Sequence, residues 1–169
     1  KPQNCPGEAR GIFVPDTPDD ALLSADIGQG ENILTTWLAE DWERWERITT
    51  PGYDEHSDLA NKIFNCDCSA GGPNAALRQI GKKVNHMRNY GGSANKIHEI
   101  LIAEGFSIYT KKDCDEFISV WKSLNSRTSQ WQDETIALAM RQGFLRNAFG
   151  RIRWFQTADY ANKALAFLP

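Results

Sequence analysis

The stretch Pro73–Ser93, which reads PNAALRQIGKKVNHMRNYGGS, predicts the helix around which the rest of the chain is interpreted. Pro73 suits the first turn of a helix, because its missing N–H would have no intrahelical partner there. Gly91 and Gly92 end the pattern, since glycine adopts the backbone conformation that follows a helix. The sequence therefore predicts a helix over 73–90.

Four polar side chains recur at every fourth position of this predicted helix: Arg78, Lys82, His86 and Tyr90. Each is rotated by only about 40° from the last, so the four form one slowly winding stripe. A guanidinium and an ammonium one turn apart can hold successive phosphates of a triphosphate, and a ring one turn further can stack on a base or sugar. The same spacing is equally typical of a solvated basic face, so both interpretations stand at this point.

An acidic turn lies upstream of this helix. The segment Leu22–Ile27 predicts a short buried strand that ends at Asp26, and Gly28-Gln29-Gly30 then breaks it. Glu31 opens a helical run, because apolar residues follow it at helical spacing. Those residues are Ile33, Leu34, Trp37 and Leu38.

The remaining pattern is mostly helical. Asp54 or Ser57 can cap a short helix that runs to Phe64, and Ser93 can cap a helix over 94–103. A long helical pattern from Lys111 to Gln142 has a predicted kink at Asn125-Ser126, a hairpin over 144–155 turns at Gly150, and a last helix starts near Ala158. The predicted fold class is α+β, predominantly helical, with a small sheet.

The composition is that of an ordinary globular domain. With 169 residues, 41% hydrophobic and 24% charged, the chain does not resemble disordered, collagen-like or coiled-coil sequences, and it has no apolar run long enough to span a membrane and no signal-peptide pattern. The net charge of -3 hides an asymmetry: residues 1–73 hold five Lys or Arg against fourteen Asp or Glu, and residues 74–169 hold fourteen against eight. An acidic part can gather metal ions and a basic part can bind phosphate, although two solvated faces of opposite sign explain the same counts.

The four cysteines do not form a zinc-binding pattern. Only Cys66 and Cys68 are close in sequence, and the single residue between them is fewer than the two to four that separate zinc-ligand pairs. Four cysteines are also too few for a disulfide scaffold, so free thiols in a reducing compartment are expected.

The string from Arg78 to Ser93 resembles motif B of the family A DNA polymerases, the bacterial DNA polymerase I type. That motif has Arg, three residues, Lys, two residues, Asn, an aromatic residue, three residues, and Tyr-Gly. The pair Tyr90-Gly91 selects Lys82 rather than Lys83, and Asn85 takes the place of the motif's Asn.

Other segments extend the resemblance over essentially the whole chain. The string LSADIGQGE at 23–31 resembles motif A, an apolar strand followed by Asp-Tyr-Ser-Gln-Ile-Glu, with Asp, Gln and Glu at the same offsets. Asp54-Glu55-His56 stands where the family has Asp-Ile-His. Further segments are similar to the family's Leu-Gln-Asn, Arg-x-x-Phe and Gly-Arg-Arg elements: 2–4, 10–13 and 149–153.

The resemblance implies template-directed DNA synthesis, in which a primer 3′-hydroxyl attacks the α-phosphate of a dNTP at a two-metal Mg²⁺ site. It implies that Asp26 and the carbonyl of Ile27 bind metal, that Lys82 is the acid that protonates pyrophosphate, and that Glu31 excludes ribose. The implied nucleotide-binding residues are Gln29, Glu31, His56, Arg78, Lys82, His86 and Tyr90. The implied primer or template contacts are Gln3, Asn4, Arg10, Tyr90, Arg151 and Arg153, although Arg151 and Arg153 are equally typical of an exposed hairpin.

The resemblance also implies a domain plan and partners. Residues 1–40 would be part of the palm with motif A, 41–145 the fingers with the motif B helix, and 146–169 a return hairpin and a truncated palm helix. The fold would then place fingers helices on part of a small antiparallel palm sheet. The implied partners are primer-template DNA, dNTP and the remaining palm and thumb segments, with no membrane, in the cytoplasm of a bacterium or of a virus-infected host cell.

Departures from the family pattern set further expectations. His86 replaces the usual Phe or Tyr, and Ile27, Gly28 and Gly30 replace Tyr, Ser and Ile, which implies a looser nucleotide pocket. The family's His-Asp-Glu motif would follow Pro169, so this chain is expected to bind nucleotide or DNA weakly and not to extend a primer by itself.

Two alternative functions remain at this stage. A non-catalytic nucleic-acid-binding module of the same fold would keep the helix stripe without the chemistry. A single-subunit RNA polymerase shares a similar motif B, but the offsets of Gln29 and Glu31 favour the DNA-polymerase motif A.

Overall fold

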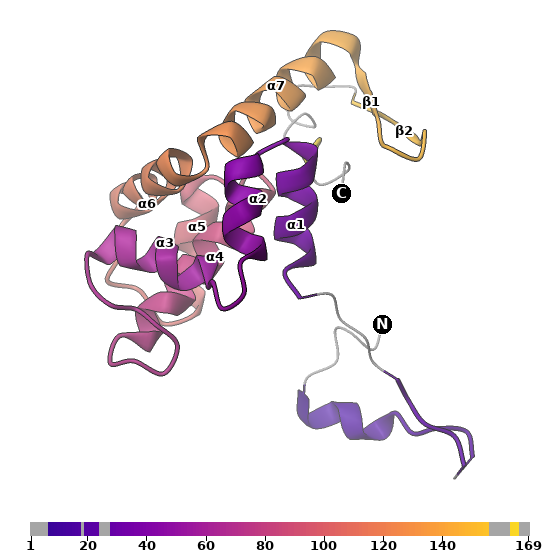
Figure 1. Cartoon of the computed structure of the whole chain (residues 1–169), viewed down its shortest axis with the longest axis vertical. Coiled ribbons are helices and arrows are strands. Elements are labelled where there is room, and N and C mark those ends of the chain that lie inside the picture. The colour runs from indigo at the N-terminus through magenta and orange to yellow at the C-terminus, as the bar shows by residue number, and fades with distance from the viewer. Residues whose placement is uncertain (1–6, 18, 24–27, 156–162, 166–169) are drawn as a thin grey trace.

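The computed structural model describes residues 7–17, 19–23, 28–155 and 163–165. It confirms a predominantly helical α+β fold with a small antiparallel sheet (Figure 1). The elements are the 3₁₀ helix η2 (Gly7–Ile12), the helices α1 (Gly30–Leu38), α2 (Trp42–Thr49), α3 (Glu55–Phe64), α4 (Ala75–Asn89), α5 (Ala94–Ala103), α6 (Lys111–Leu124) and α7 (Ser126–Gln142), and the strands β1 (Phe144–Arg146) and β2 (Ile152–Trp154).

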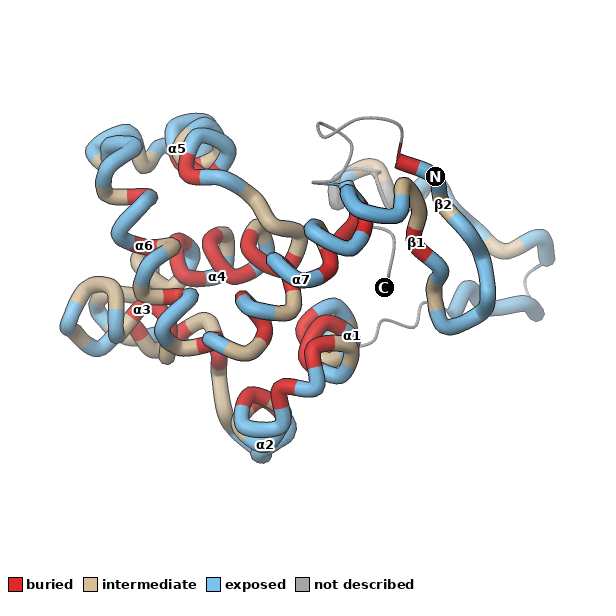
Figure 2. The backbone as a smooth tube through the Cα atoms, turned by 90° about the horizontal axis from the view of Figure 1, so that it is seen from above, coloured by how far each residue is buried: buried red, intermediate tan, exposed pale blue. Residues whose placement is uncertain are grey.

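Helices α3 to α6 enclose the main apolar core. Leu59 of α3, Ile80 and Val84 of α4, Ile97 of α5 and Trp121 of α6 are fully buried in one cluster. Buried residues follow α4 along much of its length, because other helices cover it on several sides (Figure 2). The predicted helix over 73–90 is therefore confirmed and lies at the centre of the bundle.

Helix α3 approaches α4 closely at Gly81. A Cβ atom at that position would lie 2.5 Å from the carbonyl oxygen of His56 and 3.0 Å from the Cβ of Ala60. Only glycine permits this approach, since a contact of 2.5 Å with a backbone oxygen is a steric overlap. The N-terminal turn of α3 is consequently held against the middle of α4.

The predicted element boundaries are confirmed at several sites. Asp54, rather than Ser57, is the N-cap of α3, and Ser93 caps α5 through the amide of Lys96. The long pattern divides at Asn125 into α6 and α7, and the hairpin turns at Gly150, whose φ of 80° suits glycine. Of the helix predicted to start near Ala158, only residues 163–165 are described, and they form a turn and a bend, so the prediction is wrong at those residues.

Helix α7 continues beyond the bundle and leads into the hairpin (Figure 1). The two strands are antiparallel and pair Phe144 with Trp154, Leu145 with Arg153, and Arg146 with Ile152. Leu145 is buried in a second small cluster with Ala139 of α7, Phe155 and Ala164. The hairpin thus packs on the end of α7 and not on the main core.

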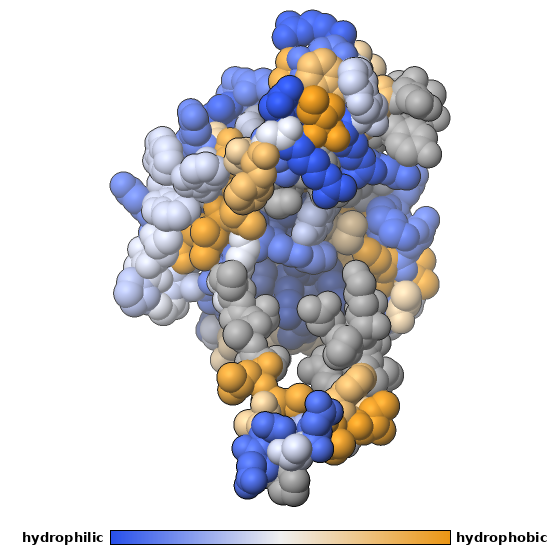
Figure 3. All heavy atoms as spheres, turned by 90° about the vertical axis from the view of Figure 1, so that its right-hand side faces the viewer, coloured by the Kyte–Doolittle hydropathy of each residue, from blue (hydrophilic) through white to orange (hydrophobic). Residues whose placement is uncertain are grey.

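The predicted buried strand at Leu22–Ile27 is wrong where the structure describes it. Residues 21–23 are not in a strand, and Leu22 and Leu23 are 61% and 96% exposed; residues 24–27 lie outside the description. A strand needs a hydrogen-bonded neighbour, and the strands of the described segments pair with each other instead. Figure 3 shows the apolar surface of this N-terminal segment, which includes Ile12 and Val14.

The helical run predicted after Glu31 is confirmed as α1, but the face of this helix that packs on the bundle is not the apolar one. Helix α1 ends at Leu38, and Asp41 caps a separate helix α2 that the sequence did not reveal. On α1 the buried face consists of Asn32, Thr35 and Thr36, whereas Leu34 and Trp37 are exposed. The helical period was correctly recognised, but the face that packs on the bundle is the polar one.

No helix in the described residues is both long enough and apolar enough to cross a membrane.

Candidate nucleotide-binding site

The stripe predicted on α4 faces solvent. Lys82 and His86 are exposed, and Arg78 and Tyr90 are half-buried. Ile80 and Val84 lie on the opposite face of the same helix, whereas Asn85 and Asn89 lie beside the stripe, and all four are buried. Because the four polar side chains are spaced every four residues along the helix, they lie along one side of it and share one accessible surface.

Asp54 holds the guanidinium of Arg78. Arg78 donates from Nε to Oδ2 of Asp54 at 2.6 Å and from Nη2 to Oδ1 at 3.2 Å. The same carboxylate caps α3, because it accepts from the amides of His56 and Ser57 and from the Ser57 hydroxyl. One side chain thus fixes both the start of α3 and the orientation of Arg78 on α4.

The hydrogen bonds at Asp54 also change its acidity. Burial pushes the pKa of this carboxyl upward, but the hydrogen bonds from Arg78 and Ser57 outweigh burial and lower the pKa from 3.8 to about 2. Asp54 is therefore ionised at neutral pH and holds Arg78 through a charge-assisted bidentate pair.

His56 lies at the N-terminus of α3, beside α4. Burial is the largest influence on its pKa and lowers it, and the nearby cations Arg78 and Lys82 act in the same direction, against Glu55 and Asp54. Its Nδ1 atom is buried and has no hydrogen-bond partner among the residues that the structure describes. The imidazole is therefore neutral at pH 7 and lies within electrostatic reach of both cations of the stripe.

The other end of the stripe meets α1 through Glu31. The Tyr90 hydroxyl donates to Oε1 of Glu31 at 2.6 Å, and Nδ1 of His86 lies 2.9 Å from Oε2. The rings of His86 and Tyr90 pack edge to face with centroids 5.5 Å apart. Burial and then the Glu31 contact raise the pKa of Tyr90 to about 12, so the phenol keeps its proton. Gln29 is at the N-cap of α1, next to this group.

A buried network of polar side chains connects α4 to the neighbouring helices. Arg44 of α2 is fully buried and donates from Nε to Glu55 of α3 at 2.7 Å. Asn85 of α4 donates to Glu55 at 2.8 Å and accepts from the indole of Trp121 at 2.8 Å. Asn89 accepts from Arg44 at 3.2 Å. The network joins α2, α3 and α6 to α4, the helix that carries the solvent-facing stripe.

Sequence reasoning missed Asp54 as a partner of Arg78 and missed the network altogether. Asn85 was identified as a motif residue on another face of α4, but its polar partners come from segments far away in sequence. The available signal was the pair of uncharged amide side chains Asn85 and Asn89, which lie one turn apart on the same helix as the stripe. Polar side chains on a buried face must find partners, because an unpaired buried polar group is costly.

Several predicted site residues are not brought to this site. Gln3, Asn4, Asp26 and Ile27 lie outside the described residues, and so does the side chain of Arg10, which belongs to η2. Arg151 and Arg153 lie on the hairpin, at the opposite end of α7 from the bundle (Figure 1).

The described residues contain no group of three or more His, Cys, Asp or Glu side chains that could hold a metal ion. The predicted ligands Asp26 and Ile27 supply a carboxylate and a carbonyl oxygen, donors that suit Mg²⁺.

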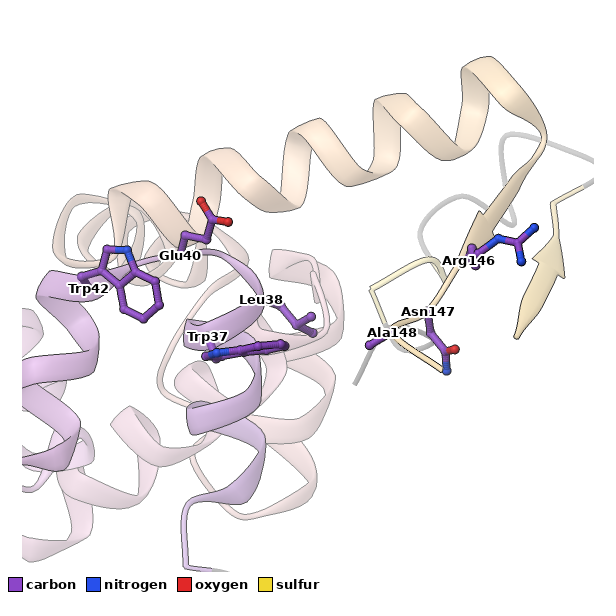
Figure 4. Close-up of a pocket in the computed structure, with 7 residues that line it drawn as sticks. All are labelled: Trp37, Leu38, Glu40, Trp42, Arg146, Asn147 and Ala148. Atoms are coloured by element: carbon purple, nitrogen blue, oxygen red, sulfur yellow. The ribbon is translucent and has the colours of Figure 1, made fainter. Parts of the chain in front are cut away.

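A hollow of about 470 Å³ lies between the α1–α2 junction and the hairpin (Figure 4). None of the predicted site residues lines it. Its lining residues are Trp37, Leu38, Glu40, Trp42, Arg146, Asn147 and Ala148.

Comparisons with known proteins agree with the resemblance. DNA polymerase I of Caldicellulosiruptor bescii is 28% identical over 156 residues, which cover 92% of this chain and 17% of that protein. The solved POL domain of Pol1 from M. smegmatis, in complex with DNA primer-template and dNTP, has a TM-score of 0.63 and 19% identity over 83% of this chain and 24% of that chain, and it confirms the fold. This chain spans about a sixth of the length of the curated relative. Because the model of DNA polymerase family A matches residues 3–166, nearly the entire sequence, the chain belongs to DNA polymerase family A.

Proposed function

We propose that this chain forms the triphosphate-binding part of a DNA polymerase that adds deoxynucleotides to the 3′-hydroxyl of a primer on a DNA template. The observation that carries the proposal is the solvent-facing stripe of α4, where Arg78 and Lys82 lie one turn apart beside His56. The family supports it, and so does the relative solved with primer-template and dNTP. The same proposal includes a division of the chain into part of the palm (1–40), the fingers (41–145), and a return hairpin with a truncated palm helix (146–169).

The phosphate end of the site is Arg78, Lys82 and His56. Asp54 occupies the Nε and Nη2 edge of Arg78, and Nη1 bonds to no other described residue. Lys82 is exposed and forms no ion pair within the described segments. Both cations are thus available to phosphate oxygens, Lys82 as the acid for the leaving pyrophosphate, and neutral His56 donates a further hydrogen bond.

The sugar and base end is Glu31, His86 and Tyr90, with Gln29 beside them. The shared hydrogen bonds of Glu31 hold the two rings in place. A carboxylate fixed in this way opposes a ribose 2′-hydroxyl sterically, and the rings provide a stacking surface for the incoming base. His86 in place of a larger aromatic residue makes this surface smaller and more polar.

Asp26 and the carbonyl of Ile27 would hold Mg²⁺, which supplies charge neutralisation of the phosphates when bound. Gln3, Asn4, Arg10, Arg151 and Arg153 would contact primer or template, with Tyr90 beside the templating pair. The proposal includes a location in the cytoplasm of a bacterium or of a virus-infected host cell.

Binding of a fluorescent dATP analogue to the 169-residue chain, measured by anisotropy with Mg²⁺, tests the triphosphate site. Arg78→Ala and Lys82→Ala should each weaken binding by about tenfold or more, because each removes a charge-assisted contact. Lys83→Ala is the matched control, since Lys83 is on the same helix but pairs with Glu104. Equal weakening in all three variants, or no binding by the parent chain, would contradict the site.

Primer extension by the longest polypeptide that contains this sequence tests the chemistry separately. Asp26→Ala should abolish extension and leave primer-template binding unchanged. If the protein is a non-catalytic binding module instead, Asp26→Ala should change neither primer extension nor primer-template binding.

A further inference from the structure

Two thiols converge in the loop between α3 and α4. The sulfur atoms of Cys66 and Cys68 lie 3.6 Å apart, and Cys66 is half-buried while Cys68 is fully buried. A closure of roughly 1.5 Å would bring the two sulfurs to disulfide distance. The third described cysteine, Cys114, is buried in the main core instead.

Side chains from both flanking helices hold this loop in shape. Asn61 of α3 accepts from the amide of Cys68 at 2.7 Å, and Asn74 at the start of α4 donates to the carbonyl of Asp67 at 2.9 Å. The Ser57 hydroxyl lies 3.3 Å from the carbonyl oxygen of Cys68. The two thiols are therefore held together by the fold, which raises their effective concentration relative to a flexible chain.

The two thiols differ in access, because Cys68 is fully buried and Cys66 is half-buried. Burial raises the pKa of Cys68 to about 11, and the hydrogen bond to Cys66 contributes in the same direction. Cys68 therefore keeps its proton, and its sulfur shares a hydrogen bond with the sulfur of Cys66, which is the more accessible of the two. The other titratable groups that face the pair are Asp67 of the loop and Tyr109.

We propose that Cys66 and Cys68 are a redox-modification site that takes a small disulfide, such as oxidised glutathione, as its co-reactant. Cys66 gives its proton to solvent, and its sulfur attacks one sulfur of the glutathione disulfide; the released glutathione thiolate takes up a proton, and a mixed disulfide remains on Cys66. Cys68 then loses its proton to solvent, attacks the Cys66 sulfur and releases the second glutathione thiolate. The two protein thiols are oxidised by two electrons, and one glutathione disulfide is reduced to two glutathione molecules.

The site is connected to the phosphate-binding residues. The Ser57 hydroxyl that approaches Cys68 also donates to Asp54 at 2.7 Å, and Asp54 holds Arg78. Closure of the disulfide would move the Cys68 carbonyl and disturb this chain of contacts. An effect on triphosphate binding rests on the proposed function, whereas the disulfide itself does not.

Equilibration of the Cys5→Ser chain in glutathione buffers, followed by alkylation and peptide mass mapping, tests the proposal. The substitution removes a thiol that lies outside the described residues. We expect a Cys66–Cys68 linkage with a free Cys114. The ratio of the oxidised glutathione concentration to the square of the reduced glutathione concentration at which the linkage is half-formed should be about tenfold lower in the folded chain than in denaturant. Cys68→Ser should leave a stable mixed disulfide on Cys66, Cys66→Ser should leave Cys68 unmodified, and Cys114→Ser should change nothing.

Three outcomes would overturn the proposal: two thiols that stay free, a mixed disulfide on Cys66 that never resolves, or equal oxidation in the folded and unfolded chain. Anisotropy with the dATP analogue on oxidised and reduced chain then reports the coupling. Unchanged nucleotide binding with the disulfide mapped would overturn the coupling alone, and absent binding in both forms would count against the proposed function instead.

Discussion

The carboxylate of Asp54 accepts hydrogen bonds from the backbone of His56, from the backbone and side chain of Ser57, and from Arg78. A carboxylate with this many donors is strongly stabilised in its ionised form. At the scale of single residues, Asp54 is the N-cap of α3 and also orients the guanidinium of Arg78 in the candidate site.

The pH dependence of stability should reveal this role. Because the pKa of Asp54 in the folded chain, about 2, lies below its ordinary 3.8, ionised Asp54 stabilises the folded state above about pH 4, and that contribution is lost as the pH falls from 4 towards 2. Asp54 is partly exposed, so solvent screening reduces the contribution to about 1 kcal/mol.

Urea unfolding of the parent and of Asp54→Asn measures this contribution. The difference in free energy of unfolding should be largest near pH 6 and should shrink towards zero near pH 2. A difference that stays constant over this range would mean that the charge of Asp54 does not contribute.

At the scale of elements, one buried carboxylate joins two helices. Asp41 is the N-cap of α2 and accepts from the amide of Arg44 at 3.0 Å. Its other oxygen accepts from the amide and the hydroxyl of Thr128, in the first turn of α7, at 3.1 and 2.7 Å. Both helix N-termini have free backbone N–H groups, so a single side chain that accepts hydrogen bonds from both helices stabilises both.

Asp41→Ala should therefore destabilise the chain more than the loss of an ordinary cap. We expect a cost of about 3 kcal/mol, since the buried donors of Thr128 lose their partner as well. Thr110→Ala, which removes the exposed cap of α6, should cost about 1 kcal/mol. Chemical denaturation of both variants gives the comparison, and equal costs would show that the second cap is worth nothing.

At the scale of the whole molecule, the bundle is held together by polar contacts as well as by its apolar core. Arg44 and Arg88 lie on the ring of Trp121, with guanidinium carbons 5.7 and 5.2 Å from its centroid. Arg44 also pairs with Glu55, and Asn85 connects that pair to Trp121. These contacts tie the helix that carries the candidate site to three others.

Glu55→Gln should destabilise the whole fold by about 3 kcal/mol, because it leaves the fully buried Arg44 without a counter-charge. Glu99→Gln breaks an exposed pair with Lys96 and should cost less than about 0.5 kcal/mol. Thermal and urea unfolding of the two variants measure the contrast. Similar small losses in both would indicate that the buried charge is dispensable.

The stripe of α4 and the boundaries of several helices could be predicted from the sequence, because helix periodicity and caps such as Ser93 are local properties, whereas the separate helix α2 was not predicted. The pairing of Asp54 with Arg78, the network around Asn85 and the convergence of Cys66 with Cys68 depended on tertiary structure, since each is set by packing or by the path of a loop. The error at Leu22 and Leu23 has the same origin: an apolar run favours a strand, but only a neighbouring strand can pair with it. The sequence by itself determined the family and the side chains of the stripe, and the tertiary structure decided which buried charges hold that stripe in place, because burial and pairing arise only when distant segments meet.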